Sequence, residues 1–458
     1  MRHEAFIRWH EERWLPSRPG PRPISSEAHR DRSGVPGLDK PETLASNRRP
    51  EMVARRARPP LALLVLVTAI APGALHILVP SLPLLANAFG APAARIQLVL
   101  TLFLAGIAIG QLVYGPISDR FGRRPVLIAG LVLFLVGTAL CGLAWSLPVL
   151  ITGRVLEACG GMVLGRAIVR DLFDRERAAG AIATITMAMS LVPSLSPAIG
   201  AYLAEWVGWR ADFAVLAAVG AGVLMLTIAK LEETHTARTS VRVSGMVGSF
   251  VLLLRSPAFL GFAFATAFTS ASWFSFLASA PYLLSQVLHE PPSTYGLMIL
   301  LPMLGYIIGN AGVARLSVAL GIGGVFVLGL ALSLASGVML AVWCLADLTP
   351  WALFVPMAIS SIGNGLSQPP GIAAGLSVYP QVAGAASGLI GFLQMMVAAL
   401  GTLLIGQLPQ STPFAMITVV GGSLALALAF GLVVRRAPEE VAQLQLHPGL
   451  RPGLARRP

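Results

Sequence analysis

Long hydrophobic runs separated by short polar connections dominate the chain after Pro60. Each run is close to the ~20 residues that a helix needs to cross the hydrocarbon core of a bilayer. The pattern predicts an all-α polytopic membrane protein with 12 transmembrane helices, six on each side of a polar stretch at 231–249. The predicted spans cover residues 61–84, 95–116, 125–145, 147–169, 179–203, 211–230, 258–284, 294–314, 322–346, 350–374, 381–406 and 413–435.

Composition agrees with a membrane protein. The 458 residues are 55% hydrophobic and 12% charged, a charged fraction well below the ~25% of soluble domains. Much of the net charge of +12 lies outside the hydrophobic runs, so we expect contact with the lipid bilayer and its anionic headgroups rather than with nucleic acid. Cys141, Cys159 and Cys344 lie inside hydrophobic runs without metal-ligand spacing. We therefore predict free thiols, no metal and no other cofactor.

Basic residues predict the orientation, because cytoplasmic loops of membrane proteins are enriched in Arg and Lys. The opposite side would hold only Arg95 and Arg210. Both termini are therefore expected in the cytoplasm, in a bacterial inner membrane. The loops predicted to be cytoplasmic hold Arg120, Arg123, Arg124, Arg170, Arg175, Arg177, Lys230, Arg238, Arg242, Arg255 and Arg315.

The same patterns divide the chain into five parts. Residues 1–59 have no run long enough to span a membrane, and they predict a disordered cytoplasmic tail. Met52, followed by VARRARPP and a hydrophobic run, is an alternative start of translation. The other expected parts are an N-terminal six-helix bundle at 60–230, a cytoplasmic linker at 231–257, a C-terminal six-helix bundle at 258–435 and a cytoplasmic tail at 436–458. We expect a monomer.

A short charged turn, GPISDRFGRRP, joins the second and third predicted spans. Its glycines permit tight turning and close helix approach, and its acidic and basic side chains can form an ion pair. The pattern resembles the loop between helices 2 and 3 of the major facilitator superfamily. That resemblance implies two pseudo-symmetric six-helix halves around a central cavity. The matching residues are Gly115, Asp119, Arg120, Gly122, Arg123 and Arg124.

The resemblance also implies a gating role for this turn. In the superfamily its aspartate latches the inner end of helix 2 to helix 11, so Asp119 would dock where helix 11 opens near Gly384, at a helix N-terminus that favours an anion. The alternative is a turn that only fixes the topology. Asp171, at the end of RAIVRD in the fourth span, could join this cluster or could lie at a solvated helix end.

Charged residues inside membrane spans are costly and rare, and two of them lie in the fourth span. Arg154 and Glu157 are three residues apart in GRVLEACGG, so they share one face of a helix. Drug antiporters of the superfamily carry R-x-x-Q-G here. The resemblance implies that Arg154 tunes a proton-carrying acid. Glu157 could be that acid, or it could only neutralise Arg154.

The first span contains His76 in GALHILVPSLP. The bicyclomycin-resistance (Bcr/CflA) branch, which the chain resembles most closely here and in helices 2, 4 and 11, usually has an acidic residue at this position. A histidine can take up a proton near neutral pH, so His76 could take part in coupling or could only pack. At ~1.5 Å per residue it lies at a depth comparable with Arg154 and Glu157, which is compatible with a shared site.

Two further sets of residues are candidates for gating and substrate contact. The fifth span partly matches the antiporter motif G-P-x-x-G-G, which implies a helix kinked by proline. The seventh span is rich in aromatic residues that could line a cavity or could pack. The candidates are Pro193, Pro197 and Gly200 for the kink, and Asn310, Asn364, Gln368 and Gln394 as polar residues of the cavity.

The sequence contains no nucleotide-binding loop, zinc spacing or nucleophile elbow, and its connecting loops are short, so we expect no enzymatic activity. With the resemblance to Bcr/CflA proteins, the sequence predicts a proton-coupled secondary transporter that exports small drug-like molecules by alternating access. One alternative is an exporter of a small endogenous metabolite, such as a sugar or an amino acid. The other is a non-transporting membrane sensor.

Overall fold

The computed structural model describes residues 61–160, 168, 192–193, 195–234 and 243–435. All of these residues belong to one compact unit. They are helical apart from short turns, and no strand occurs among them, so the predicted all-α class is confirmed. The tails predicted at 1–59 and 436–458, and Asp171, lie outside the described residues.

The first predicted span is interrupted near its end. A 3₁₀ turn that contains Pro80 separates α2 from α3, because proline lacks the N–H that an uninterrupted helix would use. Further along the first half, α5 packs against α6 and α9, and α4 packs against α6. The elements are α2 (Leu61–Ile77), η1 (Val79–Ser81), α3 (Leu82–Phe89), α4 (Ala93–Phe121), α5 (Arg123–Gly142), α6 (Leu147–Gly160), a helical stretch at 195–206 and α9 (Arg210–Lys230).

In the second half, two predicted spans run on as the single element α13, which breaks at Gly321, where φ is 70° and ψ is 164°. The predicted linker contains the helix α10, which the sequence did not indicate. The elements are α10 (Val243–Leu254), α11 (Pro257–Tyr282), η2 (Leu283–Val287), α12 (Pro292–Met298), α13 (Leu300–Ala346), α14 (Pro350–Ser377), η3 (Pro380–Val382), α15 (Ala383–Gln407) and α16 (Phe414–Arg435).

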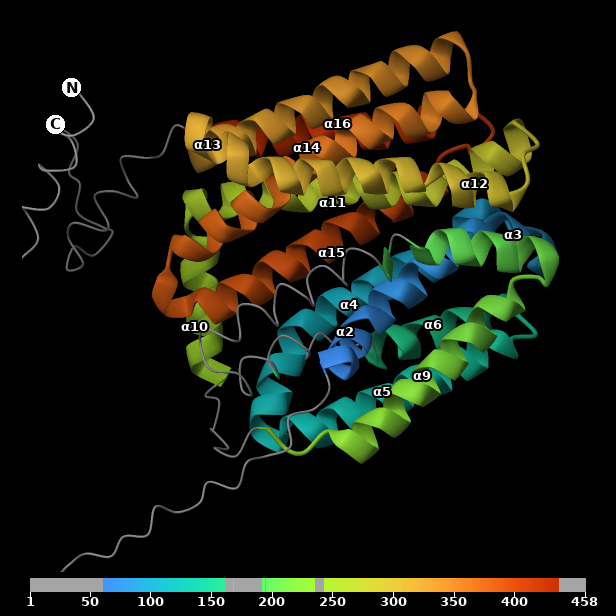
Figure 1. Cartoon of the computed structure of the whole chain (residues 1–458), viewed down its shortest axis with the longest axis horizontal. Helices are drawn as coiled ribbons and strands as arrows, with labels where there is room; N and C mark the ends of the chain where they lie inside the picture. The colour runs from blue at the N-terminus through green and yellow to red at the C-terminus, as the bar shows by residue number, and fades with distance from the viewer. Residues whose placement is uncertain (1–60, 161–167, 169–191, 194, 235–242, 436–458) are drawn as a thin grey trace, which may run out of the picture. The chain divides into compact units, whose positions relative to one another are not determined.

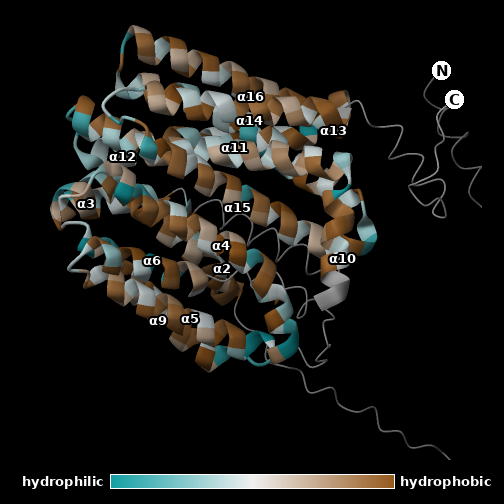
Figure 2. Cartoon of the chain, turned by 180° about the vertical axis from the view of Figure 1, so that it is seen from behind, coloured by the Kyte–Doolittle hydropathy of each residue, from teal (hydrophilic) through white to brown (hydrophobic). Residues whose placement is uncertain are grey.

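Eight helical segments of the described part are long and apolar enough to cross a membrane, judged by length and composition. One of them, Pro292–Ala346, covers two predicted spans. Figure 2 shows mainly hydrophobic residues along α5 and α9, with hydrophilic residues gathered at their ends. Val136 in α5 and Met225 in α9 are among the large hydrophobic side chains that are exposed. Such a surface is the one expected where helices face lipid.

The two halves meet where α4 packs along α15 and where α11 packs against η1 and α3. We call the end of the helices that carries the 115–124 turn the motif end, and the other end the opposite end. In Figure 1, α10 lies towards the motif end, whereas α3 and α12 lie at the opposite end. The helix α4 runs from the opposite end at Ala93 to the motif end at Phe121.

Candidate functional site

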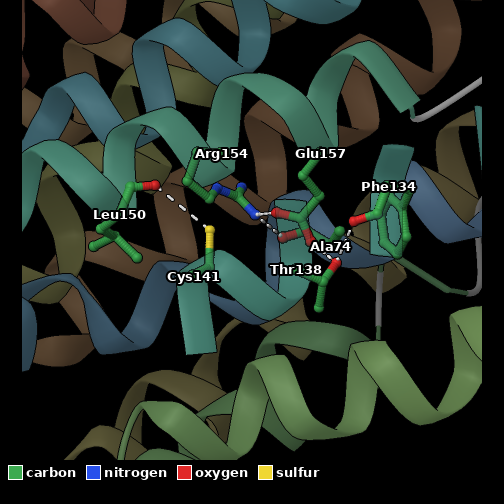
Figure 3. A network of polar contacts seen from close by, with 7 residues as sticks. All are labelled: Ala74, Phe134, Thr138, Cys141, Leu150, Arg154 and Glu157. Atoms are coloured by element: carbon green, nitrogen blue, oxygen red, sulfur yellow. Dashed lines mark hydrogen bonds and ion pairs between the residues drawn. The ribbon is translucent and has the colours of Figure 1, made fainter. Parts of the chain in front are cut away.

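Arg154 and Glu157 in α6 form a buried ion pair (Figure 3). The Nη1 atom of Arg154 lies 2.5 Å from Oε2 of Glu157, and both residues are 0% exposed. The Thr138 hydroxyl of α5 donates a hydrogen bond of 2.9 Å to Oε1. Both carboxylate oxygens therefore have a partner. The pairing expected from the i, i+3 spacing is present, and the role of Glu157 in proton transfer stays a prediction.

Glycines bring α5 close enough to α6 for this contact. A Cβ atom at Gly137 would lie 2.5 Å from the backbone nitrogen of Glu157, and one at Gly153 would lie 2.8 Å from the carbonyl oxygen of Gly137. No larger residue fits at either position without a backbone shift. The two glycines thus place Thr138 beside the carboxylate of Glu157.

Arg154 also contacts two other helices. Its Nη1 donates a hydrogen bond of 3.3 Å to the carbonyl oxygen of Ala74 in α2. Its guanidinium carbon lies 3.8 Å from the ring centroid of Phe103 in α4, a cation–π geometry. Among the described residues, Nε of Arg154 has no hydrogen-bond partner. The charge of Arg154 therefore lies where α2, α4 and α6 meet.

His76 is buried, but it contacts a different part of the structure. Its Nδ1 lies 2.8 Å from the carbonyl oxygen of Pro72, and its ring centroid is 5.9 Å from that of Phe274 in α11. No hydrogen bond joins His76 to Arg154 or Glu157 among the described residues. His76 and Phe274 therefore pack together where the two halves meet, and a proton-carrying role for His76 stays a prediction.

In the second half, two of the four predicted cavity residues lie together. Gln394 of α15 donates a hydrogen bond of 3.0 Å to Oε1 of Gln368 in α14. Gln368 in turn donates to the hydroxyl oxygens of Thr269 and Ser270 in α11 at 2.9 and 3.1 Å. This amide pair links three helices.

The other two cavity candidates do not join the amide pair. Asn310 donates to the carbonyl oxygen of Tyr306 in its own helix at 3.1 Å. Oδ1 of Asn364 is buried without a hydrogen-bond partner among the described residues. Contact of any of the four with substrate stays a prediction.

The fifth predicted span packs on the end of α2. Pro193 is helical, Pro197 is buried, and both precede Gly200. A Cβ atom at Gly200 would overlap the carbonyl oxygen of Ile77, so a larger residue there would push the two segments apart. A gating kink at the prolines stays a prediction.

At the motif end, Asp119 pairs with Arg123 through a 2.7 Å contact between Oδ1 and Nη2. Arg123 is buried, and its Nη1 also donates to the hydroxyl of Ser118. No hydrogen bond joins Asp119 to α15 in the part of the chain that the structure describes, and Gly384 has no heavy atom within 4 Å of a Cβ built on it. Docking of Asp119 on the N-terminus of α15 therefore stays a prediction.

The other residues of the motif differ in their surroundings. Arg120 is exposed, with its guanidinium 5.3 Å from the ring centroid of Phe121. Arg124 donates a hydrogen bond of 3.1 Å to the carbonyl oxygen of Ile228 in α9. A Cβ atom at Gly115 would have no described heavy atom within 4 Å, so no close helix approach depends on this glycine in the observed conformation.

Glu233, just beyond α9, is a motif partner that the sequence analysis missed. Its carboxylate accepts hydrogen bonds from the backbone nitrogens of Arg123 at 2.9 Å and Arg124 at 3.3 Å. It thereby caps the positive N-terminus of α5. Gly122 precedes this helix with φ of 98°, and a Cβ there would lie 2.5 Å from Oε2 of Glu233. The glycine is needed both for the turn and for the cap.

We expect Glu233→Ala to lower the free energy of unfolding by about 1–2 kcal/mol, because two charge-assisted hydrogen bonds to a helix N-terminus are lost. Denaturant titration of the purified protein in detergent measures this change. Glu232→Ala is the matched control, since the neighbouring Glu232 is exposed and should have an effect within about 0.5 kcal/mol. Equal stability of the two variants would contradict the capping role.

Two polar residues of α4 join the halves near the opposite end. Gln97 is fully buried, and its Nε2 donates a hydrogen bond of 2.6 Å to the carbonyl oxygen of Ala278 in α11. One turn further on, the hydroxyls of Thr101 and Thr402 in α15 are 2.9 Å apart. These contacts, which we call the opposite-end seal, hold α4 against α11 and α15.

We expect Gln97→Ala to shift the protein towards a conformation with this seal open. One buried hydrogen bond contributes about 1 kcal/mol, so the ratio of open to closed molecules should rise about fivefold. Electron paramagnetic resonance distances between spin labels at the exposed positions Trp145 and Trp351, in a variant without native cysteines, measure the two populations. Thr418→Ala is the control, because the Thr418 hydroxyl donates to the carbonyl oxygen of Phe414 in its own helix and, among the described residues, to no other helix. An unchanged distance distribution would contradict the seal.

The chain is similar in sequence to a known family of membrane transporters and to proteins named for drug resistance. A family model described as the Major Facilitator Superfamily matches residues 64–402 and 262–456. A bicyclomycin resistance protein homolog of Haemophilus influenzae is 26% identical over 339 residues, which are 73% of this chain and 85% of that protein. A chloramphenicol resistance protein of Pseudomonas aeruginosa is 30% identical over 342 residues, covering 73% and 80%. Multidrug resistance protein D of Escherichia coli is 27% identical over 356 residues, covering 77% and 89%.

Solved transporter structures share the fold. A structure of the peptide transporter POT in complex with sulfate matches with a TM-score of 0.69 at 16% identity, covering 84% of this chain and 95% of that one. A structure of a D-xylose–proton symporter matches with a TM-score of 0.65 at 14% identity, covering 81% and 96%. At these identities the likeness concerns the fold alone.

Proposed function

The chain belongs to the Major Facilitator Superfamily, and on this premise we propose that it exports small drug-like molecules in exchange for protons. Relatives named for resistance to bicyclomycin, to chloramphenicol and to multiple drugs support this class of substrate. The chain is a multi-pass membrane protein. We place it in a bacterial inner membrane as a monomer, with both termini and the motif end in the cytoplasm, in agreement with the distribution of basic residues.

The observation that carries the proposal is the buried Arg154–Glu157 pair. A carboxylate in the membrane interior is stable when a cation neutralises it or when it binds a proton. A cationic substrate or a rearrangement of the cavity that disturbs the pair would therefore change the protonation of Glu157. Proton and substrate would then compete for one carboxylate, which is the physical basis of antiport.

Alternating access requires two conformations that the ligands bind unequally. The hydrogen bonds of Gln97 and Thr101 support a state that is closed at the opposite end. In the other state, closed at the motif end, Asp119 would dock on the N-terminus of α15. The turn and the seal would thus favour opposite conformations.

Accumulation of chloramphenicol in bacteria that lack their own efflux pumps tests the proposed function. We expect cells that express the protein to accumulate less drug than control cells, and we expect a protonophore to abolish the difference. Equal accumulation at verified membrane expression, repeated with bicyclomycin and a cationic dye, would contradict drug export.

We expect Asp119→Asn to reduce efflux while leaving the fold intact. Loss of one anion at a helix N-terminus removes roughly 0.3–1 kcal/mol, so efflux should fall by about two- to fivefold. Initial rates of dye efflux at equal membrane abundance measure the change. Asp347→Asn is the control, because Asp347 is exposed near the opposite end. Normal efflux by Asp119→Asn would remove the gating role.

A further inference from the structure

The first turn of α9 holds a buried acidic residue, Asp212, that does not belong to the Arg154–Glu157 ion pair. Asp212 is 0% exposed. Its Oδ2 accepts a hydrogen bond of 2.6 Å from the Ser81 hydroxyl in η1, while its Oδ1 has no hydrogen-bond partner among the described residues. In the sequence, Asp212 follows Arg210 at the start of a predicted span, a place where charged residues are ordinarily solvated.

Because it is buried, Asp212 differs from the acidic residues that commonly occur at the start of a helix. An acid in the first turn usually stabilises its own helix through the helix dipole while remaining in water. Asp212 instead faces the break in the first span, where the Ser81 hydroxyl is its one hydrogen-bond partner among the described residues. An ionised carboxylate with one hydrogen bond is strongly disfavoured in such a place. A bound proton removes that penalty.

The other buried charges of the first half also favour a bound proton on Asp212. Away from the motif end, the buried side chains of the first half that carry formal charge in the described part are Arg154, Glu157 and Asp212. Arg154 bonds directly to Glu157 and also interacts electrostatically with Asp212. One arginine cannot neutralise two buried carboxylates, so one of the two acids is stable there only with a bound proton. Since the direct bonds of Arg154 go to Glu157, Asp212 is the acid for which a bound proton is favoured.

Within the described part of the chain, the other groups around Asp212 do not supply a second cation. Arg210 of the same helix donates to the carbonyl oxygen of Ala144 at 3.0 Å and stacks on Trp209 at 4.2 Å. From α2, His76 bonds to the backbone of its own helix. From α5, the hydroxyl of Thr138 is bonded to Glu157.

We propose that Asp212 is a second proton-binding group of this transporter and that it shares Arg154 with Glu157. The inference rests on the proposed drug–proton antiport. Ser81 and η1 lie near the opposite end, where α11 of the second half packs against η1. Opening of the seal there admits water to Asp212, which then exchanges its proton with that side of the membrane. When Arg154 turns towards Asp212, Glu157 is the acid that needs the proton, so one proton serves both carboxylates in turn.

Infrared difference spectroscopy of the purified, substrate-free protein, recorded during a pH titration, tests the inference. A protonated carboxylic acid has a C=O stretching band that its ionised form lacks. We expect the wild type to show such a band at neutral pH and to lose it at high pH, and we expect Asp212→Asn to lack it. Asp119→Asn is the control and should keep the band, because Asp119 is partly exposed at the motif end. Absence of a titrating band in the wild type, or its survival in Asp212→Asn, would overturn the proposal.

Two further variants keep the test decisive if Asp212→Asn does not fold. Asp212→Glu should retain a titrating band at a shifted frequency. Glu157→Gln leaves one arginine facing one carboxylate, so Asp212 should be ionised and the band should be missing at neutral pH. An unchanged band in both variants would overturn the proposal. The spectrum is recorded without substrate, so a result that overturns the role of Asp212 does not contradict drug export. Conversely, a result in the efflux assay that contradicts drug export does not change the spectrum.

Discussion

Arg154→Gln is expected to lower the free energy of unfolding by about 3–5 kcal/mol, because breaking a buried ion pair leaves an uncompensated charge. Arg154 is fully buried and bonds to Glu157 and to Ala74. Its removal leaves the Glu157 carboxylate with the Thr138 hydroxyl as its one remaining partner among the described residues. Arg120→Gln is the matched control, since Arg120 is an exposed arginine of the same half and its loss should change stability by less than about 0.5 kcal/mol.

A double-mutant cycle separates loss of the pair from loss of the arginine alone. In the double variant Arg154→Gln/Glu157→Gln, no charge of the pair remains buried, and the two amides can bond to each other. We expect the double variant to be more stable than Arg154→Gln alone, with a coupling free energy of about 1–3 kcal/mol. Denaturant titration in detergent measures all four proteins. Additive effects would mean that the pair does not act as a unit.

Glu157→Gln is expected to abolish drug accumulation driven by a pH gradient while preserving drug binding. Glutamine has the shape of glutamate, and its one amide oxygen can still accept from Arg154. Its NH2 group can donate to the Thr138 hydroxyl, which in turn donates to the carbonyl oxygen of Phe134, but the amide does not titrate. Arg154 keeps its contacts with Ala74 and Phe103, which should preserve the fold. A transporter that cannot exchange a proton at this position can only equilibrate its substrate.

Uptake into inside-out vesicles, with and without a pH gradient, measures the coupling, and drug binding in detergent measures the site. Thr138→Ser is the control, because it keeps the hydroxyl that bonds to Glu157 and should preserve coupling. If Glu157→Gln accumulates drug as the wild type does, Glu157 is a structural partner of Arg154. His76→Asn is then the next variant to measure.

Local patterns in the sequence predicted most of the described helices and the Arg154–Glu157 ion pair. Hydrophobic runs of membrane length fix the spans, and an i, i+3 spacing on a helix places Arg154 beside Glu157 in any helical structure. Asp119 and Arg123 are four residues apart in the sequence, but they belong to two helices, α4 and α5, and the turn at Gly122 brings their side chains together. The Arg154–Glu157 contact depends on one helix alone, so the spacing in the sequence was sufficient to predict it.

The hydrogen-bond partners that the sequence did not predict lie in distant segments of the chain. Glu233 caps a helix that begins 110 residues earlier, and Gln97 bonds to a carbonyl 181 residues away. No periodicity encodes such distances. Asp212 was missed for a different reason: a charged residue at the start of a span ordinarily lies in the interface, and only the break in the first span buries it against Ser81.

Proton movement during drug transport by the wild-type protein in sealed proteoliposomes tests drug–proton antiport most directly. A pH-sensitive dye inside the vesicles and radiolabelled chloramphenicol report the two fluxes in one preparation. We predict that an imposed pH gradient drives chloramphenicol against its own gradient, and that protons move in the opposite direction in step with it. Chloramphenicol transport without proton movement, and without any response to the pH gradient, would contradict the account.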